Sequence, residues 1–237
     1  KKSEYWRAEV EIIRNDSTHG SMYLADEALK IIEQFIQKEK YKNRTELFQS
    51  LSKLVNALVR AKPLMALLYN RGHRILDFIS ALPKDEKSIS KIKKQVLQEI
   101  ELIREETATK QKSLIKYGSK LIMDQHIVLT HSASALVESI FLEAKRLKKH
   151  YRVICTESRP RQEGTQLAIR LSKADIKTRL IPDMDIARVM NEVNFFLTGA
   201  DRITETSLIN KTGTLTAAIV AREMNVPFYI AIDSAKI

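Results

Sequence analysis

The sequence is poor in the residues that build irregular or cross-linked structure. Among 237 residues there are six glycines, five prolines and a single cysteine, Cys155. One cysteine excludes an internal disulfide and a cysteine-based metal cluster. The scarcity of glycine and proline argues against long irregular linkers. Cys155 ends an apolar run that begins at Tyr151, which favours a buried strand residue over a nucleophile.

Long apolar stretches are also missing. No stretch approaches the ~20 residues that cross a membrane, and no signal peptide is visible. The chain nevertheless begins Lys1-Lys2 without a methionine, so residues ahead of it are expected. We expect a cytoplasmic protein without a membrane partner. Its length of 237 residues suffices for one large domain or two small ones.

Acidic residues are fewer than basic ones, and the formal net charge is +11. Most of this excess lies in residues 1–120, where lysine and arginine are interleaved with glutamate. Few aromatic residues lie among them, so no stacking platform for single-stranded nucleic acid is expected. Solvated helix faces therefore explain the charge best, and weak, non-specific RNA binding remains an alternative.

Residues 1–120 have the apolar spacing of α-helices throughout. The spacing predicts a first helix from Glu4, a second with Ser21 as its N-cap, and a fourth with Pro63 in its first turn. Pro83 and Asp85 are expected to separate this fourth helix from a long fifth one. The pattern predicts a helical bundle that forms an N-terminal domain of residues 1–122.

After Asp124 the pattern changes to short apolar runs. Helical patterns separate five such runs, which occupy residues 126–130, 152–155, 177–181, 194–197 and 228–232. Strands that alternate with helices predict a doubly wound parallel sheet, so we expect the fold class α/β with a Rossmann-like domain at residues 123–237. No Gly-x-Gly-x-x-Gly follows the first strand, so the dinucleotide fingerprint is absent. We expect no cofactor and no metal.

Polar residues follow the predicted strands, where an open α/β sheet forms its ligand crevice. They are Ser132 and Ser134 after the first strand, Arg159 and Glu163 after the second, Asp183 after the third and Asp201 after the fourth. The planar guanidinium of an arginine suits a phosphate. Serine before a helix and aspartate in a turn are also ordinary cap and turn chemistry, which is the alternative interpretation.

The stretch from Val193 to Thr214 carries the strongest signal. Its strand is followed by Asp201, then by Asn210 and Lys211, and Gly213 leads into an apolar-periodic helix. A lysine beside a helix N-terminus favours an anion, because unpaired N–H groups and the helix dipole add to its charge. This stretch predicts a sugar-phosphate or nucleotide-phosphate pocket into which the Asp201 carboxylate points.

These loops resemble those of a known family. T-E-S-R-P-R-Q-E-G at 156–164, G-A-D-R-I at 199–203, N-K-T-G-T at 210–214 and P-F-Y-I at 227–230 are similar to motifs of the α, β and δ regulatory subunits of translation initiation factor 2B. A-K-P-L-M-A-L-L-Y-N at 61–70 extends the resemblance to the helical half. The family also contains archaeal homologues and isomerases of methylthioribose-1-phosphate and ribose-1,5-bisphosphate.

The resemblance implies a protein partner, an oligomeric assembly and a C-terminal end that continues beyond the given residues. The implied partner is translation initiation factor 2, and the implied assembly is a homodimer or higher oligomer that pairs through the α/β halves. Family members usually continue past Asp233 to Ile237 with another strand and a helical tail. The C-terminal end is therefore expected to be incomplete.

Three departures from the isomerases favour a non-catalytic homologue. The resemblance implies that the isomerases use a cysteine and an aspartate; the aspartate matches Asp201, whereas Ser132 stands at the cysteine position. Glu163 replaces a glutamine, and His19-Gly20-Ser21 replaces an Arg-Gly-Ala phosphate loop. We therefore expect an archaeal-type, α-subunit-like regulatory protein, with a sugar-phosphate isomerase as the alternative, in which Asp201 would be catalytic. The expected ligand-binding residues are His19, Gly20, Ser132, Ser134, Arg159, Glu163, Asp201, Asn210 and Lys211.

Overall fold

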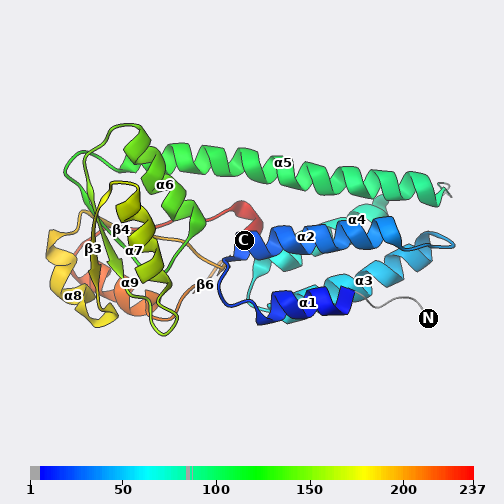
Figure 1. The fold of residues 1–237 in the computed structure, drawn as a ribbon, viewed down its shortest axis with the longest axis horizontal. Coiled ribbons are helices and arrows are strands. Elements are labelled where there is room, and N and C mark those ends of the chain that lie inside the picture. The colour runs from blue at the N-terminus through cyan, green and yellow to red at the C-terminus, as the bar shows by residue number, and fades with distance from the viewer. Residues whose placement is uncertain (1–5, 84–85, 87) are drawn as a thin grey trace. The chain divides into compact units, whose positions relative to one another are not determined.

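The computed structural model describes residues 6–83, 86 and 88–237 (Figure 1). The chain divides into two compact units, one of helices up to Ala108 together with Ala235–Ile237, and one from Thr109 to Ser234. The expected helix start at Glu4 and the expected break at Asp85 lie outside the described residues. The domain boundary proposed after residue 122 follows the end of the fifth helix.

The helical unit is built from amphipathic helices. Their bounds are α1 Trp6–Asn15, α2 Ser21–Lys38, α3 Arg44–Ala61, α4 Ala66–Ala81 and α5 Ile89–Leu121, the last of which continues into the other unit. Leu47, Leu51 and Leu54 of α3 recur every three or four residues and are completely buried. Each such side chain contributes roughly 1.5–3 kcal/mol through burial. Packing of these apolar helix faces against one another therefore stabilises the bundle.

Two local predictions in this unit are wrong. Ser21 is the first residue of α2 and not its N-cap, which is Gly20. The preceding loop is instead organised by Asp16, whose carboxylate accepts from the backbone N–H of Thr18 and His19. Pro63 precedes α4 in a turn closed by Met65 N–H donating to the carbonyl of Lys62, at 3.0 Å, because proline suits the second position of a β-turn.

The α/β unit contains the predicted parallel sheet. Its strands are β1 Ile127–Thr130, β2 Arg152–Thr156, β3 Lys177–Ile181, β4 Phe195–Thr198 and β7 Phe228–Ile230, in the order β3-β2-β1-β4-β7. All four strand pairings are parallel. The predicted fold class, α/β with N-terminal helices, is confirmed.

Helices cover both faces of this sheet (Figure 1). The helices α6 Ala135–Arg146 and α7 Glu163–Lys173 bury Phe141 and Leu167 against one face. The helices α8 Ile186–Val189 and α9 Thr214–Glu223 bury Ile186 and Ala217 against the other. Two apolar cores therefore hold the strands in place, and the polar chemistry lies in the loops at the strand ends.

The strand order reverses between β1 and β4. From β1 the chain proceeds to β2 and β3 on one side, and it then returns to place β4 and β7 on the other side. Open α/β sheets bind ligands at the carboxyl ends of the strands that flank such a switch point. Here these ends are Thr130 of β1 and Thr198 of β4, so a ligand is expected at the loops that follow these two strands.

Short elements occur where the sequence indicated other structure. The residues after β4 form a two-stranded antiparallel ribbon, β5 Arg202–Ile203 and β6 Leu208–Ile209, instead of a simple loop. The helix expected near Met184 is only the four-residue α8, flanked by the 3-10 turns η1 Asp183–Asp185 and η2 Met190–Glu192. A third 3-10 turn, η3, spans Ser234–Lys236. Among the described residues, none of the helices has the length and apolar character needed to span a bilayer.

Candidate functional site

Three predicted site residues contact one another at the switch point. Lys211 Nζ lies 2.6 Å from Glu163 Oε1, and Ser132 Oγ donates to the same oxygen at 3.4 Å. They come from the loop after β1, the first turn of α7 and the connection between β6 and α9. The side chains of Lys211 and Glu163 are 14% and 27% exposed. We call Ser132, Glu163 and Lys211 the switch-point cluster.

Glu163 is positioned by the close approach of α7 to β2. It is the first residue of α7, where a carboxylate is favoured by the helix dipole. The next residue is Gly164, and a Cβ there would lie only 1.9 Å from the carbonyl oxygen of Thr156. Only glycine lets the helix begin this close to the strand. Within the described part of the chain, Glu163 Oε2 is buried and has no hydrogen-bond partner.

Lys211 lies in a tight turn at the start of α9. Thr214 Oγ1 donates to the carbonyl of Lys211 at 2.7 Å, and Asn210 Nδ2 donates to Thr214 Oγ1 at 3.0 Å. The N-cap of α9 is Gly213, with φ at +101°, and it has no side chain with which to satisfy the first N–H groups of the helix. A cation beside a helix N-terminus without a side-chain cap is suited to an anion.

His131, which is not among the predicted site residues, lies at the centre of this region. The imidazole is completely buried; its Nδ1 lies 2.7 Å from Thr156 Oγ1 and its Nε2 lies 2.8 Å from the carbonyl oxygen of Thr212. The carbonyl oxygen of Thr212 can only accept, so Nε2 carries a proton. The backbone carbonyl of His131 accepts from Thr198 Oγ1 at 2.8 Å. The only sequence signal was its position directly after β1.

A second network joins the loops after β1, β2 and β3, and its residues Ser132, Arg159 and Asp183 are among those that the sequence placed at the strand ends. Ser132 N–H donates to Ser158 Oγ at 2.7 Å. Asp183 accepts from the backbone N–H of Ser158 at 2.7 Å and of Arg159 at 2.8 Å. Ser132 and Ser158 both have positive φ, 70° and 62°. Such strained backbone in non-glycine residues is concentrated at functional sites.

The remaining predicted residues of this unit have other partners in the structure. The guanidinium of Arg159 pairs with Glu157 at 3.0 Å. Ser134 caps α6 by accepting from Val137 N–H at 3.4 Å. Asp201 N–H donates to the carbonyl of Ile209, which closes the base of the β5–β6 ribbon. Their roles as ligand residues stay predictions.

His19 and Gly20 belong to the helical unit. His19 Nδ1 lies 2.6 Å from Asp16 Oδ2, and the imidazole stacks on Tyr23 with centroids 4.0 Å apart. Burial alone would raise the pKa of Asp16, but hydrogen bonds from His19 and Thr18 hold it well below its ordinary value. The loop is therefore ordered by its own contacts. A ligand role for His19 and Gly20 stays a prediction.

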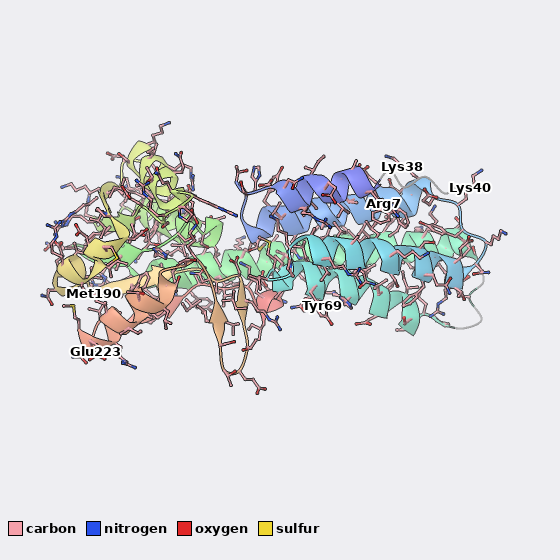
Figure 2. The ribbon with its side chains drawn as sticks, turned by 90° about the horizontal axis from the view of Figure 1, so that it is seen from below. Arg7, Lys38, Lys40, Tyr69, Met190 and Glu223 are labelled. Atoms are coloured by element: carbon pink, nitrogen blue, oxygen red, sulfur yellow. The ribbon has the colours of Figure 1, made fainter. Side chains whose placement is uncertain are left out.

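Many basic side chains of the helical unit are paired with acidic ones. Arg74 contacts Glu99 and Glu106, and its pKa is raised, by its hydrogen bonds to Glu106 above all. Others extend outward, and Figure 2 shows Lys38 and Lys40 at the C-terminal end of α2. Basic and acidic side chains therefore alternate on these helices, as the sequence indicated. RNA binding stays an alternative, and its only support is the net positive charge.

The functional groups of the site are suited to binding a ligand and not to chemistry that requires a thiol. Cys155, the only cysteine of the chain, lies in β2 and is completely buried, and burial raises the pKa of its thiol to about 12. It therefore cannot serve as a thiolate near neutral pH. The switch-point cluster offers one cation, one carboxylate and one hydroxyl beside a helix N-terminus. Together these groups can hold a phosphate and accept from a hydroxyl.

These features define an α/β protein whose sheet carries, at its switch point, a cluster of polar residues that can bind an anion. The chain belongs to the initiation factor 2 subunit family, whose family model matches residues 17–237. This finding confirms the resemblance seen in the motifs at residues 156–164, 199–203 and 210–214.

Relatives of two kinds match nearly the whole chain. A translation initiation factor eIF-2B subunit 2-like protein of Pyrococcus furiosus is 29% identical over 228 residues, which cover 96% of this chain and 77% of the relative. A ribose 1,5-bisphosphate isomerase of Archaeoglobus fulgidus is also 29% identical over 228 residues, with 96% and 70% covered. Membership of the family therefore does not by itself decide between regulator and enzyme.

A solved structure supports the fold over the full length. The crystal structure of translation initiation factor eIF-2B from Pyrococcus horikoshii OT3 superposes with a TM-score of 0.84 at 28% identity. The match covers 99% of this chain and 80% of that one.

Proposed function

We propose that this chain is a regulatory member of the family, an archaeal-type homologue that binds a sugar phosphate or a nucleotide at the switch-point cluster. It acts through protein contact, with translation initiation factor 2 as the partner that the family resemblance implies. The observation that carries this proposal is Ser132, which stands where the resemblance places the isomerases' cysteine. The chain's one thiol, in Cys155, is buried elsewhere with a raised pKa. Proton transfer by a thiolate is therefore not available to it.

Each polar group has a role in this proposal. Lys211 and the N-terminus of α9 hold the phosphate, and Arg159 and Asn210 contact its oxygens or the sugar hydroxyls. Asp201 accepts from a sugar hydroxyl and does not move a proton. The proposed assembly is a homodimer or larger, which sedimentation of the purified protein tests directly.

A second candidate is a sugar-phosphate isomerase. Its support is the relative that bears the name ribose 1,5-bisphosphate isomerase, together with Asp201, Asn210 and Lys211 in the matching motifs. A serine hydroxyl is a poor proton carrier because it does not ionise near neutral pH. The candidate therefore requires turnover without the thiol, and Asp201→Asn would abolish that turnover.

Calorimetric titration combined with product analysis separates the two candidates. The purified protein is titrated with ribose-1,5-bisphosphate, methylthioribose-1-phosphate and AMP, and the same samples are analysed for isomerised product. We expect saturable binding of at least one compound, no product, and loss of binding in Lys211→Met. The control Lys173→Met removes an exposed cation at the other end of α7 and should bind as the unmodified chain does. Product formation would replace the regulatory proposal with the isomerase.

A further inference from the structure

A groove runs along the free edge of the parallel sheet. The strand β3 stands at the end of the strand order and, among the described residues, it pairs with β2 alone. An unpaired strand edge presents backbone N–H and C=O groups to which a further strand can add. The groove beside it has a volume of about 310 Å³, and we call it the α7–β3 groove. Its lining includes Thr165, Ile169, Ser172 and Lys173 of α7 and Thr178 and Leu180 of β3.

The register of β3 on β2 decides which side chains face this groove. Thr178 and Leu180 are paired with Val153 and Cys155, which belong to the core under α6 and α7. Thr178 and Leu180 therefore point to the α7 side of the sheet. Leu180 is 41% exposed and Ile169 is 44% exposed. An added strand would thus cover apolar side chains as well as unpaired backbone groups.

The same edge carries an excess of positive charge. Lys177 and Arg179 alternate with the groove residues along β3, so they lie on its other face. Arg179 pairs with Glu192 at 2.7 Å, whereas no carboxylate in the described part of the chain forms an ion pair with Lys173 or Lys177. The nearby carboxylate of Asp175 is held by another lysine. A strand that adds here is therefore attracted if it is acidic.

From this edge we propose that the α7–β3 groove binds an extended acidic segment of a partner protein, which adds to β3 as a further strand. Apolar residues alternate with carboxylates in this segment. Its apolar side chains pack on Ile169 and Leu180, and its carboxylates lie opposite Lys177 and Arg179, because side chains alternate between the two faces of a strand. The surface lies outside the switch-point cluster, so the inference does not rest on the proposed function.

The charges favour such a partner over a second copy of this chain. Two β3 edges that pair antiparallel about Thr178 or Arg179 bring Lys177 or Arg179 of one copy opposite a cation of the other. Like charges directly opposite each other destabilise a strand pair, and opposite charges stabilise it.

A synthetic peptide in which valine alternates with glutamate tests the proposal. Titration of the full chain into the fluorescently labelled peptide should show saturable binding by anisotropy, and a peptide with lysine in place of glutamate should not bind. Lys177→Glu/Arg179→Glu should weaken binding at least about five-fold, since attraction becomes repulsion. Leu180→Ser should weaken it about three-fold or more, an effect that requires apolar contact and not charge alone. Hydrogen exchange of the β3 amides should slow when the peptide is bound.

A matched control separates the groove from the overall charge. Lys110→Glu/Lys112→Glu makes the same charge change at two exposed positions of α5. Its affinity for the peptide should stay within about two-fold of the unmodified chain, as expected for distant surface charges. A loss as large as in Lys177→Glu/Arg179→Glu would show attraction by net charge and overturn the inference.

Two further outcomes would overturn it. If the peptide does not bind, or binds without slowing exchange of the β3 amides, the cations of β3 only protect the edge from aggregation. If Lys177→Glu/Arg179→Glu instead changes the sedimentation of the chain without peptide, the groove is a contact between copies. The titration with phosphate esters judges the proposed function separately, because the peptide experiment uses neither those ligands nor the variants of Lys211.

Discussion

His131 Nε2 lies 2.8 Å from the carbonyl oxygen of Thr212, so a side chain at the end of β1 holds the loop that begins α9. Through Nδ1 the same ring reaches Thr156 at the end of β2. The two hydrogen bonds fix the loop that carries Lys211, and the ammonium group of Lys211 is thereby held beside the carboxylate of Glu163. The position of Lys211, the cation of the switch-point cluster, therefore depends on the buried side chain of His131.

Replacing His131 with alanine should loosen this arrangement. It would remove the donor of the Thr212 carbonyl and an interaction of the buried Thr156 hydroxyl, which would keep Ser158 Oγ at 3.1 Å. A polar group that loses its partner in a buried site costs about 1–3 kcal/mol, and the missing imidazole also leaves a cavity. We expect the free energy of unfolding to fall by about 2–4 kcal/mol, measured by chemical denaturation of the full chain. His150→Ala, at an exposed position, should change it by less than about 0.5 kcal/mol. Equal effects of the two variants would contradict the role of His131.

Gly213, in the same loop, has little space for a side chain. Its φ of +101° disfavours any L side chain, and a Cβ would lie 3.0 Å from His131 Nε2, an atom fixed by its hydrogen bond. Gly213→Ala should lower the free energy of unfolding by about 1–3 kcal/mol. Gly20→Ala is the matched control, since φ is −77° and nothing lies within 4 Å of the point that an added methyl group would occupy. It should cost less than about 1 kcal/mol in the same denaturation experiment.

The sheet could be predicted because its inner strands are continuous apolar runs. Phe195–Thr198 is buried at every position, and apolar content alone reveals such a strand. The strand-end positions of Ser132 and Glu163 could be predicted too, since carboxyl ends of parallel strands lie at one edge. The ribbon β5–β6 was missed because two-residue strands are too short to show a period.

The partners within the site could not be predicted. The contact between Glu163 and Lys211 depends on how close α7 begins to β2, and that closeness depends on the missing Cβ of Gly164. Periodicity describes which face a residue occupies and says nothing about which side chain lies opposite. The errors at Ser21 and Pro63 have a local cause, because serine, aspartate and proline each suit several positions around a turn or helix start.

Asp16 should make the stability of the helical unit depend on pH. Its pKa is depressed in the folded chain, so its contribution is complete above the unfolded pKa of about 3.9 and is lost as pH falls towards the folded value. Asp16→Asn should therefore lower the free energy of unfolding by about 1 kcal/mol at neutral pH. The difference from the unmodified chain should narrow progressively below about pH 4, measured by denaturation at each pH.

A control for this experiment is Asp77→Asn, which removes an exposed carboxylate of α4. It should change the free energy of unfolding by less than about 0.5 kcal/mol. A difference between Asp16→Asn and the unmodified chain that stays constant from neutral to acidic pH would show that the hydrogen bonds from Thr18 and His19 do not favour the charged carboxylate.

A cysteine introduced at position 132 should report on the charge of Glu163. Ser132 Oγ is 3.4 Å from Glu163 Oε1, so a thiol there faces a carboxylate, which raises its pKa. Adding Glu163→Gln to Ser132→Cys removes that charge and leaves Lys211 as the charged neighbour, so the thiol pKa should fall by about 1 unit or more. The pH dependence of alkylation measures both variants. The unmodified chain gives the baseline, because the buried thiol of Cys155 has a raised pKa and should react slowly.

The same two variants test whether the missing thiol is what separates this chain from an isomerase. Proton transfer requires a thiolate, so the double variant should turn over ribose-1,5-bisphosphate faster than Ser132→Cys alone if the rest of the machinery is present. Asp201→Asn in the double variant should then abolish the turnover. A thiol pKa that is equal in both variants would mean that Glu163 does not act on position 132. A lowered pKa without turnover would mean that the chain lacks more than the thiol, which is the outcome expected of a binding protein.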